Sequence, residues 1–487
     1  MPDTKATDAQ QSGLQSFLCT NRDVMSVLVG LLSDQHAFFA GVSKEWRDAW
    51  GDLPRSTKAI TADTSISQLQ WSFDGGLRKR PKLCKHIVEH CDVEILQYAH
   101  SKGCALPITM PLIAAARGKL DIVQWGLDMR PRYRDMLCEA AAGGGSMSVL
   151  MWAHTDGCPW DGSTCTEAAG SGRLDVLQWA RSQNCRWDGR TCSKAAGGGH
   201  MDIISWARAH DCPWDSTTCS AAARSGHLDI LDWARSENCP WGSYTCRNAA
   251  EGGQLGILQW ARAHGCSWDY QTCSGAAEGG HLEILRWARE NGADWTSDTI
   301  RRAAERGHLE VLQWARAQGC PWYPHVSVDA ISSGNLGMIE WMIEQGCELS
   351  IHAIRAAAGN GHIHILKWMQ ANNYVLVNVY YHVCTEAASE GQLGVLQWAR
   401  CNGFDWGGDI CSLAASNGHL DVLKWARCNG CPWGENTCTS AAAAGHLDVL
   451  EWLRAEGCPW DKDTFRQVSM YRHEHVLKWA RRNGCPR

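Results

Sequence analysis

The chain has 487 residues, of which 45% are hydrophobic and 20% are charged, as in an ordinary folded protein and unlike a disordered one. Its net charge of −6 provides no positive field to recruit nucleic acid or an anionic membrane, so we expect neither as a partner. The longest apolar stretch near the N-terminus, Met25 to Leu32, is too short for an export signal or a membrane span. We therefore expect an intracellular protein, cytoplasmic or nuclear.

Residues 1–65 differ from the rest of the chain because they carry no repeat. The polar stretch 1–14 is expected to be disordered. Within 15–65, the segments Asp23–Leu32 and Phe38–Trp50 predict short amphipathic helices that together make a small helical element.

The second of these segments contains the string Val42-Ser43-Lys44-Glu45-Trp46-Arg47, which resembles the C-terminal half of an F-box. The resemblance implies a substrate adaptor that docks a cullin-type ubiquitin ligase core through Val42 and Trp46. The alternative is a helical segment that only caps the repeats following it, and the sequence leaves both interpretations open.

From residue 66 to residue 487, tryptophan and cysteine recur at intervals of 27 residues. The chain holds 27 Trp beside only 6 Phe and 9 Tyr, together with 25 Cys. One series of tryptophans occupies positions equivalent to Trp233, and a second occupies positions equivalent to Trp241. A repeat of this length predicts an array of similar units. The array is least regular at 323–384, which is read as a hinge, an inserted binding loop or decay of the repeat.

The sequence of each unit predicts two short helices. In the unit Cys212–Asn238, Ser216 or Thr217 is expected to cap a first helix that carries small residues at Cys219, Ala222 and Ala223 on one face. Gly226 provides the turn, and the second helix follows with an apolar stripe that includes Leu228 and Trp233.

A single pair of such helices cannot shield its apolar face from water, so successive units must stack on one another. We predict an all-α helical solenoid of about 14–15 stacked two-helix repeats over 66–487, with a small helical element before it.

The strings Ala221–Trp241 (AAARSGHLDILDWARSENCPW) and Ala303–Trp322 (AAERGHLEVLQWARAQGCPW) resemble ankyrin repeats. The usual ankyrin unit has about 33 residues, and the shortening falls where that family carries its extended β-turn. The resemblance implies ankyrin-like stacking, binding of other proteins and no chemistry of its own.

The repeated cysteines and histidines are interpreted as structural. Pairs such as Cys158 and Cys165 have a spacing that differs from zinc sites, and we expect buried, reduced thiols, no metal and no cofactor. The histidine that follows the turn glycine is replaced by Gln254 or Asn335 in other units, which indicates a hydrogen-bonding turn residue. The Trp233 series is expected in the core, and the chain has no Gly-rich phosphate loop, no H-E-x-x-H motif and no nucleophile elbow. We therefore expect no enzymatic activity.

The positions that vary between units form one stripe on the first helix, opposite the constant Cys and Ala positions. Repetition lays these stripes side by side, and we expect a protein partner of unknown identity to bind there. The alternative is a solvated face under no constraint. The residues predicted to contact the partner are Tyr244, Asn248, Glu251, Gln271, Glu278, Asp298, Arg302, Glu305, His325 and Asp329.

Overall fold

The computed structural model describes residues 64–74, 81–323, 325–374, 380–405, 409–471 and 473–486. Val42, Trp46 and the other residues of 1–63 lie outside this part of the chain. The described residues form α-helices, one short 3-10 helix and no strand, which confirms the all-α prediction. None of these helices is long and apolar enough to cross a bilayer.

The chain divides into two compact units, the first ending at Trp241 and the second beginning at Gly242. The helices of the first unit are α5 (Ile66–Asp74), α6 (Pro81–His90), α7 (Val93–Ser101), α8 (Met110–Ala116), α9 (Leu120–Met129), η2 (Pro131–Met136), α10 (Leu137–Gly144), α11 (Met147–Thr155), α12 (Gly162–Gly170), α13 (Leu174–Ser182), α14 (Gly189–Gly198), α15 (Met201–Ala209), α16 (Ser216–Ser225) and α17 (Leu228–Ser236).

The helices of the second unit are α18 (Ser243–Glu251), α19 (Leu255–Ala263), α20 (Tyr270–Gly279), α21 (Leu282–Glu290), α22 (Ser297–Arg306), α23 (Leu309–Ala317), α24 (Val326–Ser332), α25 (Leu336–Glu344), α26 (Ile351–Gly359), α27 (Ile363–Ala371), α28 (Tyr380–Ser389), α29 (Leu393–Cys401), α30 (Ile410–Ser416), α31 (Leu420–Cys428), α32 (Glu435–Ala444), α33 (Leu447–Ala455), α34 (Lys462–Met470) and α35 (Glu474–Arg482). Helix pairs therefore continue through the irregular stretch from α24 to α27.

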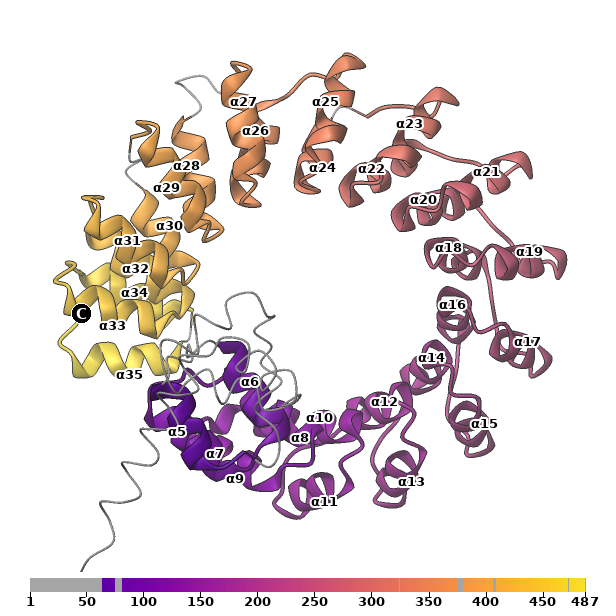
Figure 1. Ribbon diagram of the computed structural model, residues 1–487, viewed down its shortest axis with the longest axis horizontal. Helices are drawn as coiled ribbons and strands as arrows, with labels where there is room; N and C mark the ends of the chain where they lie inside the picture. Colours follow the sequence, from indigo (N-terminus) through magenta and orange to yellow (C-terminus); the bar gives the residue numbers. More distant parts are fainter. Residues whose placement is uncertain are drawn as a thin grey trace, which may run out of the picture. The chain divides into compact units, whose positions relative to one another are not determined.

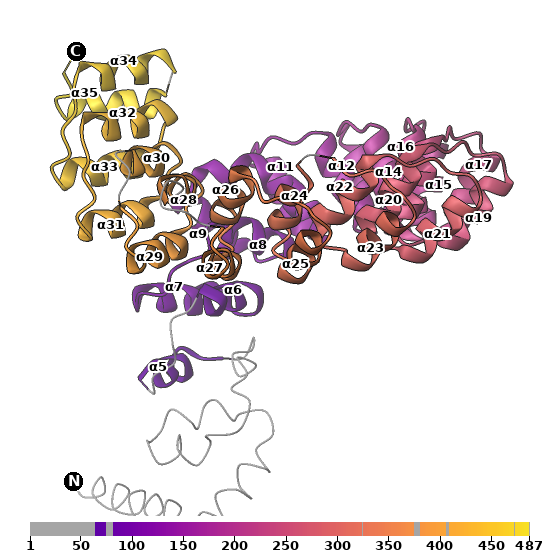
Figure 2. The same cartoon turned by 90° about the horizontal axis from the view of Figure 1, so that it is seen from above.

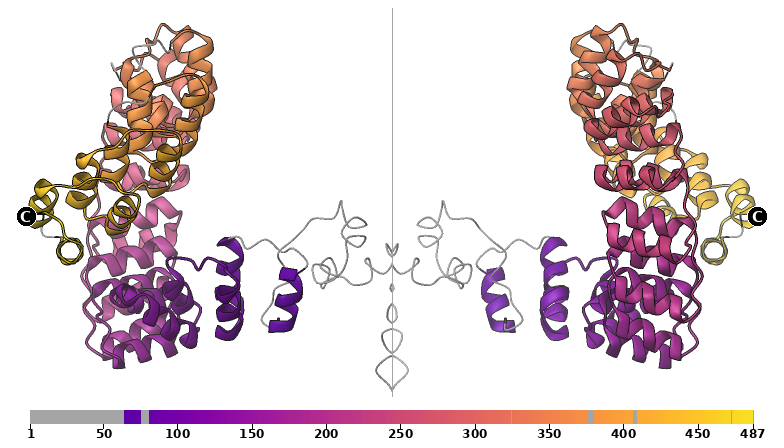
Figure 3. Two further views of the ribbon diagram at one scale, coloured as in Figure 1. Left: turned by 90° about the vertical axis from the view of Figure 1, so that its left-hand side faces the viewer. Right: turned by 90° about the vertical axis from the view of Figure 1, so that its right-hand side faces the viewer.

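Within each unit, first helices form one row and second helices form another. In the second unit, α18, α20, α22 and α24 lie side by side, with α19, α21, α23 and α25 in the other row (Figure 1). The pairs from α28 to α35 repeat this arrangement (Figure 2), and the pairs of the first unit appear as successive layers (Figure 3). The first helices pack closely on one another, whereas neighbouring second helices make few contacts.

Small side chains explain this close packing of first helices. Cys219, Ala222 and Ala223 of α16 are fully buried, as are Ile230 and Leu231 of α17. The approach is so close at some positions that only glycine fits, since a Cβ on Gly275 of α20 would lie 2.5 Å from the carbonyl oxygen of Arg247. The predicted core of small first-helix residues and branched second-helix residues is confirmed.

The prediction that the Trp233 series lies in the core is wrong for most of its members, although Trp398 is buried. Trp233 is half-buried, as are the described linker tryptophans, and Leu228 is 39% exposed. The core positions of α17 are Ile230, Leu231 and Ala234, so the indole falls on the flank of this stripe. It packs there against Trp214 with ring centroids 5.7 Å apart and planes 64° apart, the edge-to-face geometry that aromatic rings favour.

The linker tryptophan is held by the arginine that ends the preceding helix. The Arg235 guanidinium lies over Trp241 at 4.5 Å from its ring centroid, and Arg235 also donates a hydrogen bond to the carbonyl of Cys239. The same arrangement recurs at Arg181 with Trp187 and at Arg454 with Trp460. These contacts fix the connection between one repeat and the next.

The N-terminal cap of the first helix differs from the predicted one by one residue or two. Asp215, not Ser216 or Thr217, caps α16, because its carboxylate accepts a hydrogen bond from the backbone N–H of Thr217 at 2.8 Å. At the other end, Gly226 has φ of 93°, the left-handed conformation predicted for the turn.

Candidate protein-binding face

The predicted partner-contacting residues lie on first helices α18, α20, α22 and α24 and on the residue that precedes α24. Their position follows from the fold, because burial of the Cys and Ala stripe turns the opposite side of each first helix away from the core. Tyr244 is 55% exposed and Tyr270 is 41% exposed on this face. Sequence reasoning missed Tyr270, which precedes the predicted residue Gln271.

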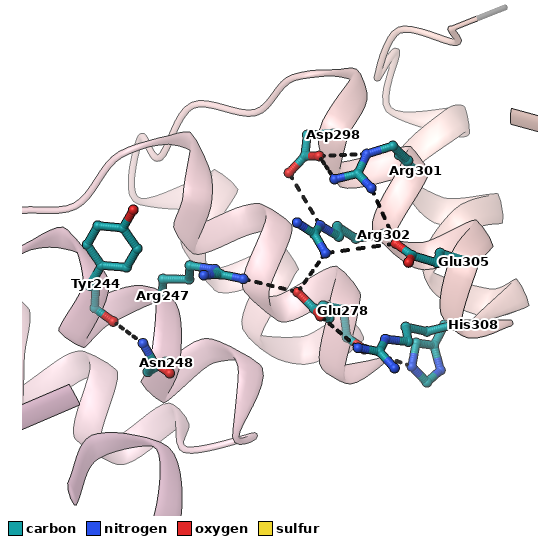
Figure 4. A network of polar contacts seen from close by, with 10 residues as sticks. Tyr244, Arg247, Asn248, Glu278, Asp298, Arg301, Arg302, Glu305 and His308 are labelled. Carbon is teal, nitrogen blue, oxygen red and sulfur yellow. Dashed lines mark hydrogen bonds and ion pairs between the residues drawn. The ribbon is translucent and has the colours of Figure 1, made fainter. Parts of the chain in front are cut away.

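Glu278 of α20 is the centre of an ion-pair network that joins three first helices (Figure 4). Its carboxylate pairs with Arg247 of α18 at 3.2 Å, and with Arg306 and Arg302 of α22 at 3.0 Å and 3.5 Å. Its side chain is only 8% exposed. Burial opposes ionisation, but the hydrogen bonds from Arg306 and Arg247 and the charge of Arg302 leave the pKa of Glu278 below its ordinary value.

A second part of the network lies within α22. Arg301 Nε donates to Asp298 Oδ1 at 2.9 Å, and its Nη1 lies 3.3 Å from Glu305 Oε2. Arg302 bridges the same two carboxylates, at 3.7 Å from Asp298 and 3.8 Å from Glu305. Burial again opposes ionisation, but the hydrogen bond from Arg301 contributes to a lowered pKa of Asp298.

The structure therefore brings together Glu278, Asp298, Arg302 and Glu305 among the predicted residues. It adds Arg247, Arg301 and Arg306, which sequence reasoning missed. All three occupy positions that vary between repeats, which is the sequence signal that would have included them.

Other predicted residues lie outside the network. The Asn248 side chain donates to the backbone carbonyl of Tyr244 at 2.8 Å, and thus contacts its own helix. The ring of His325 lies 6.4 Å from that of His352 on the next first helix. The pKa of Asp329 is raised, mainly by burial of its carboxyl group and to a smaller extent by the nearby negative charge of Glu305. Glu251 and Gln271 are half-buried on α18 and α20.

Some of the buried cysteines contact one another. The thiols in contact are 20 residues apart, as in Cys411 and Cys431, whose Sγ atoms are 3.4 Å apart. The described cysteines are free thiols, and all except Cys347, Cys401 and Cys428 are buried. Burial raises the pKa of Cys84, Cys138 and Cys273 to about 12, so these thiols stay protonated and unreactive near neutral pH.

Comparison with known proteins identifies the repeat. The family model for ankyrin repeats (many copies) matches residues 273–316 and 410–454. No curated protein matches the chain.

Three solved structures illustrate a distant similarity. The ankyrin repeat domain of human ASB11 is 17% identical, with 32% of this chain and 84% of that one covered at a TM-score of 0.26. The pentatricopeptide repeat protein PPR10 from maize is 15% identical, with coverage of 90% and 77% and a TM-score of 0.29. PPR10 in complex with an 18-nt psaJ RNA element is 11% identical, with coverage of 99% and 88% and a TM-score of 0.29. The chain therefore contains ankyrin repeats at residues 273–316 and 410–454, and the helix pair closed by a left-handed glycine recurs beyond these two segments.

Proposed function

We propose that the chain is a non-catalytic scaffold that binds another protein on the first-helix face of its second unit. The observation that carries this proposal is the contrast between two faces of the same helices. The buried face repeats Cys and Ala, whereas the opposite face presents different side chains at equivalent positions, among them Asn248, Arg302 and Asp329. Such variation on a rigid array is suited to recognising one partner surface.

The chemistry of the face indicates which part of it binds. Glu278 is already surrounded by three arginines and has little surface left, so we assign it a positioning role. Arg306 remains 56% exposed while it pairs with Glu278. Exposed Tyr244 and Tyr270 add amphipathic surface of the kind enriched in protein interfaces. We propose that the partner contacts these tyrosines and the exposed arginine.

Affinity capture tests this proposal with a matched pair of triple variants in the full chain. Tyr244→Ala, Tyr270→Ala and Arg306→Ala remove the proposed contacts. Glu283→Ala, Glu310→Ala and Gln318→Ala change three exposed positions on or next to second helices of the same unit. We expect the second variant to retain the captured partners of the wild type and the first to lose them. Identical partners for all three proteins would contradict the assignment of the face.

A second proposed function, that of a ubiquitin ligase adaptor, rests on the string from Val42 to Arg47. It predicts that a ligase core copurifies with the chain, and that Val42→Asp with Trp46→Ala abolishes this association while partners of the repeat face are retained. Absence of a ligase core from the wild-type preparation would contradict it and leave the scaffold proposal untouched.

A further inference from the structure

Helix α6 of the first unit carries three potential metal ligands on one face. His86, Glu89 and His90 each offer one ligand atom, and these atoms lie within 4.8 Å of one another. The two imidazole rings have centroids 4.4 Å apart. Between them in sequence, Ile87 and Val88 are fully buried, so packing of α6 against its neighbours fixes the opposite face and leaves the three ligands together.

The three residues occupy variable positions of the repeat. At a spacing of three 27-residue repeats, they correspond to Glu167, Gly170 and Ser171 of α12, whereas Cys84 corresponds to the constant Cys165. The expectation of no metal was based on the repeated thiols and turn histidines. His86, Glu89 and His90 belong to neither group. Nothing in the repeat requires histidine here, because α12 forms the same helix without any.

We propose that His86, Glu89 and His90 form a binding site for a divalent transition-metal ion of the zinc class. Two histidines four residues apart lie on the same side of a helix, one turn from each other, and can coordinate one ion together. Imidazole nitrogen with one carboxylate oxygen favours zinc, nickel, cobalt or copper over magnesium or calcium, which prefer oxygen alone. Three protein ligands leave a fourth position open to water or to another ligand.

Arg117 of the adjacent repeat modulates this site. Its Nη2 lies 3.8 Å from Glu89 Oε1, and the Glu89 side chain is 20% exposed while that of Arg117 is 56% exposed. The contact is long and mostly exposed on the arginine side, so the carboxylate can exchange this partner for an ion at small cost. The guanidinium nevertheless repels a cation, and its removal should tighten metal binding.

The site is tested by calorimetric titration of the reduced full chain with Zn²⁺. The exposed thiols Cys401 and Cys428 would also bind zinc, so every protein carries Cys401→Ser and Cys428→Ser. In this background we expect one ion per chain. His86→Gln or His90→Gln should each weaken binding about tenfold or more, an effect of at least 1.4 kcal/mol. Arg117→Met should strengthen binding, and the exposed His100→Gln on α7 should leave it unchanged.

Cobalt provides a second readout that is independent of affinity. Co²⁺ bound by His86, Glu89 and His90 should give a d–d spectrum without a sulfur-to-cobalt charge-transfer band. Far-UV circular dichroism of each variant checks that the helices are retained. Equal affinity of the background and the His86→Gln, His90→Gln double variant would overturn the proposal, as would a sulfur-to-cobalt band in the background protein.

Discussion

The ring of His308 contacts the end of the preceding first helix, where its Nε2 donates a hydrogen bond to the backbone carbonyl of Glu278 at 3.1 Å. Equivalent bonds join His362 to Ser332, His419 to Ser389 and His473 to Ala443, at 2.9 to 3.1 Å. The predicted turn histidine is therefore a hydrogen-bonding residue, but its partner lies in the neighbouring repeat. It satisfies a carbonyl that the end of a helix would otherwise leave without a partner.

This bond predicts which substitutions the histidine tolerates. His308→Leu should lower stability by about 1–3 kcal/mol, because the carbonyl of Glu278 loses its donor. His308→Gln should lose much less, since Gln392 makes the equivalent bond to the carbonyl of Gly359 at 2.9 Å. Urea denaturation of both variants measures the difference. Equal losses for Leu and Gln would show that the ring matters only for its bulk.

The histidine also covers the turn glycine of the preceding repeat. Gly280 has φ of 78°, and a Cβ there would lie 2.6 Å from His308 Cε1. Gly280→Ala should therefore cost more than the roughly 1–2 kcal/mol of placing alanine in a left-handed conformation. Gly265→Ala is the matched control, because Gly265 has φ of 80° with no heavy atom within 4 Å of the added Cβ. The urea midpoint should fall further for Gly280→Ala, and the reverse order would contradict the contact.

The Glu278 network predicts sensitivity to acid. The folded-state pKa of Glu278 is lowered from 4.5, so its contribution is present above that pH and is lost as pH falls further. Glu278→Gln should cost about 2 kcal/mol at neutral pH, because it removes a charge that accepts hydrogen bonds from arginine. The difference between wild type and variant should shrink on acidification below pH 4.5, as measured by thermal melts across this range. A difference independent of pH would show that the carboxylate charge contributes nothing.

The buried thiols predict the opposite dependence at high pH. Folding raises the pKa of Cys84, Cys138 and Cys273 from 9.0 to about 12. The unfolded chain therefore ionises first, and the stability present below pH 9.0 should be lost as pH rises toward 12. At neutral pH, Cys401 and Cys428 should react with a thiol reagent in the native protein, while the buried thiols should react only after denaturation. Rapid labelling of the buried thiols in the native protein would contradict their placement.

Much of the fold follows from periodicity alone. The 27-residue interval with Cys219, Ala222 and Ala223 on one face predicts a close-packed first helix, and Gly226 predicts the turn. The same reasoning fails for Trp233, because an apolar stripe does not distinguish a core position from its half-buried flank. It also misses Asp215 as the cap of α16. Ser216, one of the two predicted caps, is instead the first residue of the helix.

The candidate site was predictable in outline and not in its contacts. The variable positions could be read from the repeat, but Arg247 and Glu278 are 31 residues apart and come together only through the stacking of α18 on α20. The cysteine contacts, such as Cys411 with Cys431, depend in the same way on how one repeat folds back on itself. Pairings of this kind depend on three-dimensional distances that residue spacing does not provide.

The close stacking of first helices is tested most directly by Gly275→Ala in α20. In a helix without close neighbours, replacing glycine by alanine raises stability by about 1 kcal/mol. Here the new Cβ would meet the backbone of α18 at 2.5 Å, so we predict a lower urea midpoint for Gly275→Ala and a higher one for Gly256→Ala, whose Cβ meets nothing within 4 Å. A rise in the midpoint for Gly275→Ala would contradict the stacked array.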